Sequence, residues 1–429
     1  MKLSRPRTLA TFFVSILSLS LSQKSHGQTR HVKSPPFKHA MIFSGGDLDY
    51  FTFFGMYHAA IDAGNPPDLI IGTCGGALAS AIVKTFPNPT DLQNFIYSKK
   101  FYDYMRDVKF TDMALWKLIR SLKTVAKDAQ HQAGPYRGMR TIPNPFFKPN
   151  IMSPENNYDY PEIQRGFHSD EGPEIAIFAN KIRYDQSQVG KWVSQQEKLY
   201  TEFVFTSRYV KEKIDQHLDM NQHETSEGSF ISSETVVVTD KSLNFAARSS
   251  FTDPFYIPVE QPFLTGAVNI MSAYELAKLG REVTARYAGQ WEEIGGGIVT
   301  KFFALDPWKL YEDYTSLYAD RWVDNSIEDY KEVTMKVKMS PTLRSIPSLG
   351  IRLKSNVPQH NHRKFKKAVR SQYEFGYQQY MIANKAPRNS KNHISKRHDR
   401  DLPMAELKSA RENSASYYWS KDKKTASSN

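Results

Sequence analysis

The stretch Asp68-Leu69-Ile70-Ile71-Gly72-Thr73-Cys74-Gly75-Gly76-Ala77-Leu78 decides how the fold of this chain is interpreted. Its apolar first half predicts a buried strand, and the small-residue run from Gly75 to Phe86 predicts a buried helix. Between them, Gly-x-Cys-x-Gly has the pattern of a nucleophile elbow, a sharp strand-to-helix turn with a nucleophile at its tip. Glycines flank the tip because a β-carbon does not fit beside it. The helix that follows would direct its positive end at Cys74.

A second unit of the same kind precedes the elbow. Residues 39–43 predict a short buried strand, Ser44-Gly45-Gly46-Asp47 a glycine turn, and residues 50–63 a buried helix. Two strand–turn–helix units in succession predict an α/β fold with a largely parallel central sheet flanked by helices. Further strands are expected at residues 174–179, 203–205 and 235–239.

Three landmarks resemble the patatin-like phospholipase family (patatin-like lipid acyl hydrolases), and they stand in the family's order. The turn Ser44-Gly45-Gly46-Asp47 stands where the family has the glycine loop of its oxyanion hole, and Gly72 to Gly76 matches its elbow. The stretch 246–268 matches the segment that carries the family's catalytic aspartate, with Thr265 at the aspartate position. The resemblance implies a patatin-like fold, a lipid or acyl-chain ligand, a two-residue dyad at Cys74 and Thr265, and no cofactor.

Each landmark departs from the family at its functional residue. Cys74 replaces the serine, and a thiol needs deprotonation to act as a nucleophile. Thr265 replaces the aspartate base and does not accept a proton at neutral pH. Asp47 stands at the third glycine of the oxyanion loop, and Asp49 stands at the place of a basic residue. A carboxylate there opposes the negative charge that develops on an oxyanion.

Three functions therefore remain open. The chain is a catalytically degenerate relative that binds lipid acyl esters, or an active lipid acyl hydrolase that uses Cys74 with a displaced base. Asp47 and Asp49 are the preferred bases, and His58 is a weaker alternative that we expect to be a packed residue. The third function is that of a non-catalytic interaction protein of the cell envelope.

The composition and the N-terminus add a location and a kind of partner. Of 429 residues, 57 are Lys or Arg and 45 are Asp or Glu, so the formal net charge is +12. This charge favours an anionic membrane surface, and we find no motif for nucleic acid. A basic start followed by the apolar residues 9–21 is typical of a secretory signal peptide and predicts a secreted or periplasmic protein. Cys74 is the only cysteine, so no intramolecular disulfide forms. No metal-ligand spacing is found.

The expected organisation has one domain. The chain is expected to begin with a signal peptide at residues 1–27 and a linker at 28–37, followed by a patatin-like domain at 38–383 and a basic disordered tail at 384–429. Within the domain, the core is expected at 39–86 and 235–280, and a less typical insert at 90–234. Near its end, basic residues between Arg363 and Arg370 alternate with apolar ones at helical spacing. This pattern is that of a helix that lies on an anionic membrane, or of one that packs on the domain and turns a charged face to solvent.

Overall fold

The computed structural model describes residues 34–45, 50–106, 108–110, 142, 152–154, 161–163, 166–167, 171–189, 191, 198–220, 231–252, 263–265, 270–287, 319–324, 342–346, 350–354 and 361–385. Residues 35–429 form one compact unit, to which the elements below belong. The expected signal peptide lies outside the described residues, as does most of the linker. The basic tail lies outside them beyond Lys385.

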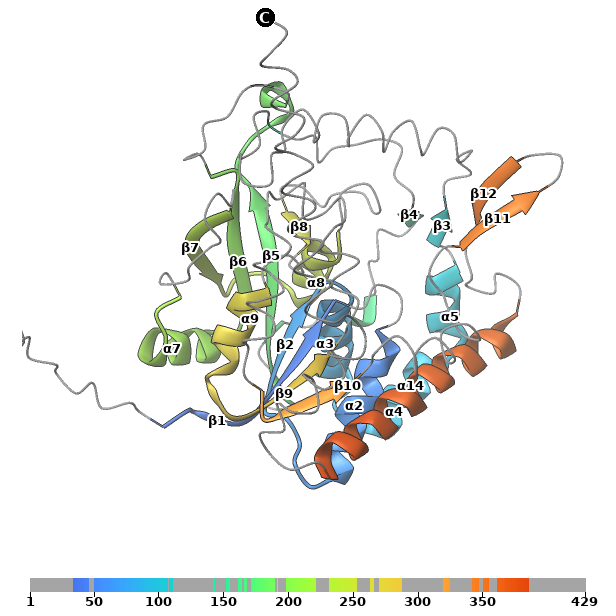
Figure 1. Cartoon of the computed structure of the whole chain (residues 1–429), viewed down its shortest axis with the longest axis horizontal. Coiled ribbons are helices and arrows are strands. Elements are labelled where there is room, and N and C mark those ends of the chain that lie inside the picture. Colours follow the sequence, from blue (N-terminus) through green and yellow to red (C-terminus); the bar gives the residue numbers. More distant parts are fainter. Residues whose placement is uncertain are drawn as a thin grey trace, which may run out of the picture. The chain divides into compact units, whose positions relative to one another are not determined.

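The first half of the unit begins with two strand–helix pairs, β1-α2 and β2-α3 (Figure 1). Its elements are β1 (Phe37–Ser44), α2 (Phe51–Asp62), β2 (Leu69–Thr73), α3 (Gly75–Thr85), α4 (Pro89–Ile96), α5 (Lys99–Arg106), β3 (Val108–Phe110), β4 (Met152–Pro154), η2 (Pro161–Ile163) and β5 (Glu174–Ile182). Helix α4 begins with a proline that needs no N–H partner and is capped by the Asn88 side chain, which accepts from the Thr90 N–H.

The second half adds the remaining strands and a long closing helix. Its elements are η3 (Gln186–Gln188), β6 (Tyr200–Thr206), α7 (Arg208–His217), β7 (Ile231–Val238), α8 (Leu243–Phe251), β8 (Phe263–Thr265), α9 (Ile270–Ala277), β9 (Gly280–Tyr287), β10 (Arg321–Asp324), β11 (Thr342–Ile346), β12 (Gly350–Lys354) and α14 (His362–Lys385). The strands predicted at 39–43, 174–179 and 203–205 lie within β1, β5 and β6, and the one predicted at 235–239 extends one residue beyond the end of β7. Strand β1 begins at Phe37, inside the expected linker, and α14 ends two residues beyond the expected domain boundary.

The central sheet has eight strands, and its main path runs in the order β10-β9-β1-β2-β5-β6-β7. The five strands from β10 to β5 are parallel, and so is the pair β6 and β7. Strand β6 is antiparallel to β5, and the short β8 pairs antiparallel with the end of β5. The chain therefore has the expected α/β fold with a mixed, largely parallel sheet. Because the leading strands are parallel, the carboxyl ends of β1 and β2 lie at the same edge of the sheet.

Apolar side chains pack on both faces of this sheet. On one face, Met41 and Phe43 of β1 join a large cluster with residues from α2, α3, α8 and α14. On the other face, Ala40 and Ile42 join a second cluster with residues from α7 and α9. The alternation along β1 follows from the period of two in a strand, and burial on both faces explains why β1 and β2 consist almost entirely of apolar residues.

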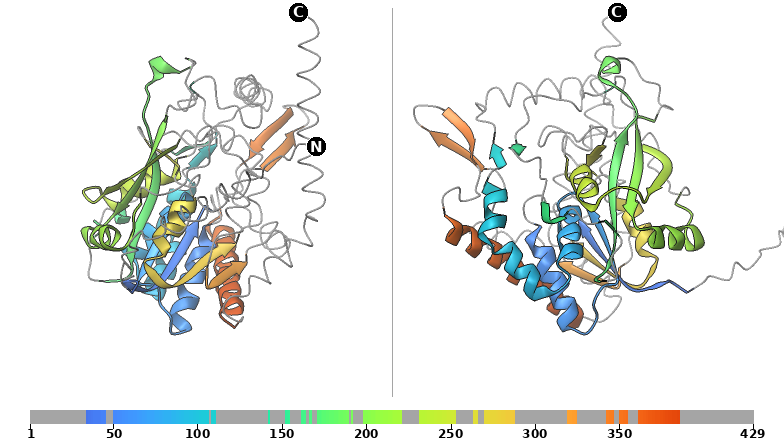
Figure 2. Two further views of the ribbon diagram at one scale, coloured as in Figure 1. Left: turned by 60° about the vertical axis from the view of Figure 1, so that its left-hand side comes forward. Right: turned by 180° about the vertical axis from the view of Figure 1, so that it is seen from behind.

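Helix α14 packs closely on α2, and the two views of Figure 2 agree on this arrangement. The contact depends on glycines. A β-carbon on Gly55 would lie 1.9 Å from the carbonyl oxygen of Tyr373, and one on Gly376 would lie 1.9 Å from that of Thr52. These two glycines therefore set how near the helices approach. Among the described helices, none has the length and apolar character needed to span a membrane.

A buried polar network joins β1, β9 and β10. The His39 side chain is fully buried, with Nδ1 2.9 Å from the carbonyl oxygen of Asn65 and Nε2 2.8 Å from Oγ1 of Thr284. This geometry suits a neutral ring that donates from Nδ1 and accepts at Nε2. Burial lowers the pKa of His39 to about 4, the Arg321 guanidinium acts in the same direction, and the hydrogen bond to Asn65 opposes both. Arg321 itself forms an ion pair with Glu282.

Candidate active site

Cys74 occupies the turn between β2 and α3 in a conformation that L-residues rarely adopt. Its φ is 53° and its ψ is −126°, and it is the one non-glycine residue with positive φ in the part of the chain that the structure describes. Such a conformation costs roughly 1–3 kcal/mol and persists only where surrounding contacts impose it. Cys74 therefore stands at the tip of a strained strand-to-helix turn, as the elbow motif predicts.

The flanking glycines are required by their surroundings. A β-carbon on Gly76 would lie 1.9 Å from the carbonyl oxygen of Phe43 at the end of β1. One on Gly72 would lie 2.5 Å from Oγ of Ser80 and 2.7 Å from the α-carbon of Ala77. The Ser80 hydroxyl in turn donates to the carbonyl oxygen of Gly76, at 2.7 Å. The elbow is thus compressed against β1 on one side and against its own helix on the other.

The glycine loop after β1 begins in contact with the elbow. Gly45 has φ +62°, and its N–H lies 3.1 Å from both the carbonyl oxygen and Oγ1 of Thr73. Its own carbonyl accepts from the N–H of Gly76, at 2.7 Å. The other expected members of the oxyanion hole and the candidate bases, Gly46, Asp47 and Asp49, lie outside the described residues.

The amide of Gly75 is a candidate oxyanion donor, because Gly75 directly follows Cys74. Gly75 is the first residue of α3, so its N–H has no partner within the helix. The residue after the nucleophile supplies one oxyanion donor in elbows of this kind. The N-terminal end of α3 therefore offers both an amide and the helix dipole to a negatively charged group at Cys74.

Ser250 holds the elbow from a distant part of the chain. The backbone N–H of Cys74 donates to Ser250 Oγ at 2.9 Å, and the Ser250 side chain is fully buried on α8. Ser250 lies in the stretch 246–268 of the family resemblance, but the sequence gave it no role. Only the packing of α8 against α3 shows the contact, because the two residues are 176 positions apart.

Strand β8 brings the backbone of Thr265 next to the elbow. Thr73 of β2 pairs with Phe178 of β5, and Thr265 pairs with the next residue, Ala179. Strand β6 pairs with one edge of β5 over these residues, so β8 must pair with the opposite edge, which is the edge that β2 occupies. Strand β8 thus continues along β5 from the point where β2 ends and the elbow begins. Successive positions along a strand lie about 3.3 Å apart, so Thr265 is placed directly beside the nucleophile turn.

His58 does not face the elbow. Its Nδ1 lies 2.6 Å from the Tyr373 hydroxyl of α14, and its Nε2 lies 3.4 Å from an Asp62 carboxylate oxygen. Asp62 also accepts from the Tyr377 hydroxyl, at 2.8 Å. These bonds direct the imidazole toward the interface of α2 and α14. The alternative of His58 as a displaced base is therefore wrong, and its expected role as a packed residue agrees with the contacts.

The described residues contain no group of three His, Cys, Asp or Glu side chains placed to hold a metal ion. Cys74 itself is partly exposed. The arrangement around it provides a strained thiol-bearing turn, a helix N-terminus and a neighbouring threonine backbone. In an elbow, such an arrangement presents the nucleophile side chain to an acyl carbonyl group.

Comparisons with known proteins give no family. No protein-family model matches the chain. No curated protein matches it either. Among solved structures, one that matches is the crystal structure of VipD from Legionella pneumophila. The match covers 81% of this chain and 67% of the VipD chain, with a TM-score of 0.30 and 10% sequence identity.

Proposed function

We propose that this protein is an exported relative of the patatin-like phospholipases that binds lipid acyl esters at the Cys74 elbow and hydrolyses them at most very slowly. The observation that carries the proposal is the backbone of Cys74, held at φ 53° and ψ −126° between β2 and α3. A strained turn of this kind persists only where its surroundings impose it, and the contacts of Gly76, Gly45 and Ser250 maintain it here. The proposed export rests on the signal-peptide pattern of residues 1–27.

The reason for slow turnover is chemical. An unperturbed thiol has a pKa of about 8.5, so most of it is protonated at neutral pH unless a base or cation is near. Thr265 stands where the family has its base, and a hydroxyl does not take up the proton. General-base catalysis contributes about 10²–10⁴-fold to a rate, and this chain lacks it at that position.

An active thiol hydrolase is the second candidate, and one observation favours it. Cys74 carries a β-carbon in a conformation that glycine adopts without strain, although the turn itself imposes no need for a side chain. In this mechanism the thiolate attacks the ester carbonyl, the Gly75 N–H stabilises the oxyanion, and Asp47 or Asp49 takes the proton. The C–O bond of the ester then breaks, the alcohol leaves with the proton returned by the carboxylic acid, and an acyl thioester remains on Cys74. Water hydrolyses this thioester, which releases the fatty acid and restores the thiol.

Ester hydrolysis by purified protein separates these functions. We compare the wild type, Cys74→Ala and the triple variant Asp47→Gly/Cys74→Ser/Thr265→Asp on short- and long-chain p-nitrophenyl esters. The proposal expects equal, near-background rates for the first two and a gain of activity in the triple variant, which restores the family's residues. A wild-type rate that Cys74→Ala abolishes would establish the thiol hydrolase instead, and Asp47→Gly alone would then lose activity if Asp47 is the base.

Lipid binding is tested separately. Native mass spectrometry of the purified protein, with lipid extraction, shows whether acyl chains remain bound. Bound lipid that is lost in a bulky Cys74→Trp variant supports an acyl site at the elbow. Absence of both turnover and lipid would refute the proposal and favour the third function, an interaction protein of the envelope.

A further inference from the structure

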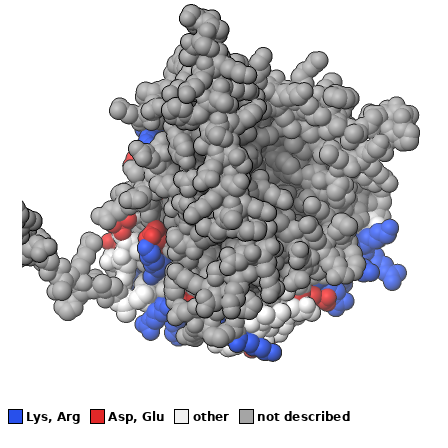
Figure 3. All heavy atoms as spheres, in the orientation of Figure 1, with Lys and Arg blue, Asp and Glu red and all other residues white. Residues whose placement is uncertain are grey.

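The first half of α14 presents a cationic face, defined here by Arg363, Lys364, Lys366, Lys367 and Arg370. All five side chains are exposed, while Phe365, Ala368 and Val369 between them are buried against the domain. With 3.6 residues per turn, the five cations fall on one side of the helix and the three apolar residues fall on the other. Figure 3 shows Lys and Arg side chains gathered at the right-hand edge of the molecule.

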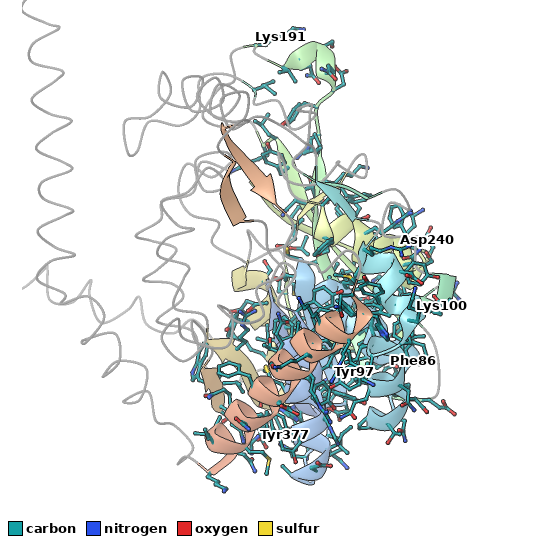
Figure 4. The ribbon with its side chains drawn as sticks, turned by 90° about the vertical axis from the view of Figure 1, so that its right-hand side faces the viewer. Phe86, Tyr97, Lys100, Lys191, Asp240 and Tyr377 are labelled. Carbon is teal, nitrogen blue, oxygen red and sulfur yellow. The ribbon has the colours of Figure 1, made fainter. Side chains whose placement is uncertain are left out.

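Most cations of this face lack the carboxylate partners that neighbouring cations have among the described residues. Arg370 pairs with Glu374 at 3.2 Å, and on the adjacent α5 Lys99 pairs with Asp103 and Lys100 with Glu162. Within the described residues, no carboxylate pairs with the remaining cations of the face, Arg363, Lys364, Lys366 and Lys367. Lys366 instead lies over the Tyr97 ring, 5.6 Å from its centroid. Lys100 and Tyr97 are labelled beside this end of α14 in Figure 4.

This arrangement works against the stability of the helix. Cations three and four residues apart, such as Arg363 and Lys367, repel each other. Arg363 and Lys364 also stand in the first turn, which contains no acidic residue, at the positive end of the helix dipole. A helix that served only as a solvated surface would be more stable with acidic residues at these places. Binding of an anionic partner gives the arrangement a physical reason.

The cationic face also lies near the edge of the sheet where the elbow is found. The ring of Phe365, in the first turn of α14, lies 6.3 Å from that of Phe51. Phe51 begins α2, immediately after the loop that leaves the carboxyl end of β1. Cys74 follows the carboxyl end of β2, which pairs in parallel with β1. The first half of α14 is thus at the same edge of the sheet as the candidate active site.

We propose that the cationic face of α14 docks the protein onto an anionic phospholipid membrane. The choice of a membrane rests on the proposed function, since a lipid ligand would reach the elbow from such a surface. The face offers charge without a stacking platform for bases, because the exposed large hydrophobic residues among those described, Tyr209 and Ile382, lie outside the first half of α14. Each Lys or Arg near an anionic membrane contributes about fivefold to binding, so four give on the order of several hundredfold.

The test is vesicle co-sedimentation of full-length protein. The first variant carries Arg363→Gln, Lys364→Gln, Lys366→Gln and Lys367→Gln. A matched control carries glutamine at Arg208, Lys211, Lys213 and Lys241, so that both variants lower the net charge by the same four units. Three of the four control positions lie on α7, which packs through Val210 and Ile214 on the opposite face of the sheet, and Lys241 directly precedes the N-cap of α8. Vesicles of phosphatidylcholine with equal parts of phosphatidylglycerol are compared with vesicles of phosphatidylcholine alone.

Wild type and control should bind the anionic vesicles, and the α14 variant should bind at least a hundredfold more weakly. Binding should weaken as salt reduces the screening length from about 8 Å at physiological ionic strength to about 3 Å at 1 M. Equal loss in both quadruple variants would show a net-charge effect and overturn the proposal. So would binding of a DNA duplex, but not of vesicles, that is lost only in the α14 variant. Vesicle binding is read without turnover, so it can succeed where lipid binding at the elbow fails.

Discussion

The strain at Cys74 can be measured by removing its β-carbon. Cys74→Ala keeps a β-carbon at φ 53° and ψ −126° but removes Sγ, whereas Cys74→Gly removes both. Relief of the strain should stabilise the glycine variant by roughly 1–3 kcal/mol. The greater freedom of glycine in the unfolded chain opposes this by about 0.5–1 kcal/mol. Cys74→Gly should therefore unfold with a free energy about 1 kcal/mol higher than that of Cys74→Ala.

The same exchange in an ordinary helix should have the opposite sign. Ala368 lies within α14 in relaxed helical geometry, so Ala368→Gly should lower the free energy of unfolding by about 1 kcal/mol relative to wild type. Equilibrium unfolding in urea, followed by fluorescence and circular dichroism, gives both differences. If glycine is less stable than alanine at position 74, by as much as at position 368, then Cys74 is not strained and the elbow geometry is wrong.

Three further predictions concern the contacts around the site and the buried network. Gly76→Ala should be destabilised by several kcal/mol, because its β-carbon would lie 1.9 Å from a backbone carbonyl oxygen. Gly64→Ala also places a β-carbon at positive φ (+70°), but in open space, so it should cost only about 1–2 kcal/mol. Equal costs of the two variants in urea unfolding would contradict this. Ser250→Ala should cost about 1–3 kcal/mol in free energy of unfolding, because it leaves the Cys74 amide without its acceptor. The hydroxyl of the adjacent, buried Ser249 has no partner among the described residues, so Ser249→Ala should cost clearly less. The pKa of His39 is lowered from 6.5 to about 4, so its contribution to stability is complete above pH 6.5 and is lost, by about 3 kcal/mol, as the pH falls toward 4. In His39→Gln, the free energy of unfolding should fall less steeply between pH 6.5 and pH 4 than in the wild type. An unchanged pH dependence would refute the assignment of this loss to His39.

Local sequence patterns were enough to predict the leading part of the fold. The apolar runs in β1 and β2 and the small residues of α3 indicate strands and a helix within a few residues of where they lie. The order and direction of the later strands cannot be predicted from such local patterns. The antiparallel pairing of β5 with β6 depends on contacts between segments far apart in the chain. The three-residue β8 is too short to show a periodicity, and only its partner β5 defines it as a strand.

The candidate site divides in a similar way. Cys74 and its flanking glycines could be found because elbow geometry restricts residue types at adjacent positions. Thr265 could be found only through resemblance, and its place next to the elbow follows from the register of β8. Ser250 could not be given a role, because a serine in an Ala/Ser-rich helix has no local signal for a long-range hydrogen bond. His58 could be mistaken for a base, since the sequence does not show that α14 covers it.

The contacts that hold the elbow are independent of the chemistry at its tip. The Gly45 N–H bonds the Thr73 carbonyl, the Gly76 N–H bonds the Gly45 carbonyl, and Ser250 accepts from the backbone of position 74. None of these bonds involves the side chain of Cys74 or of Thr265. A chain can therefore exchange serine for Cys74 and aspartate for Thr265 while the turn is retained. The Cys74 side chain packs partly against the cluster of α2, α3, α8 and α14, so packing and, on the proposed function, contact with a ligand are two separate reasons for a side chain at this strained position. The comparison of Cys74→Gly with Cys74→Ala in both stability and lipid binding separates these two causes. A glycine variant that is more stable but has lost its lipid would show that the thiol is kept for the ligand.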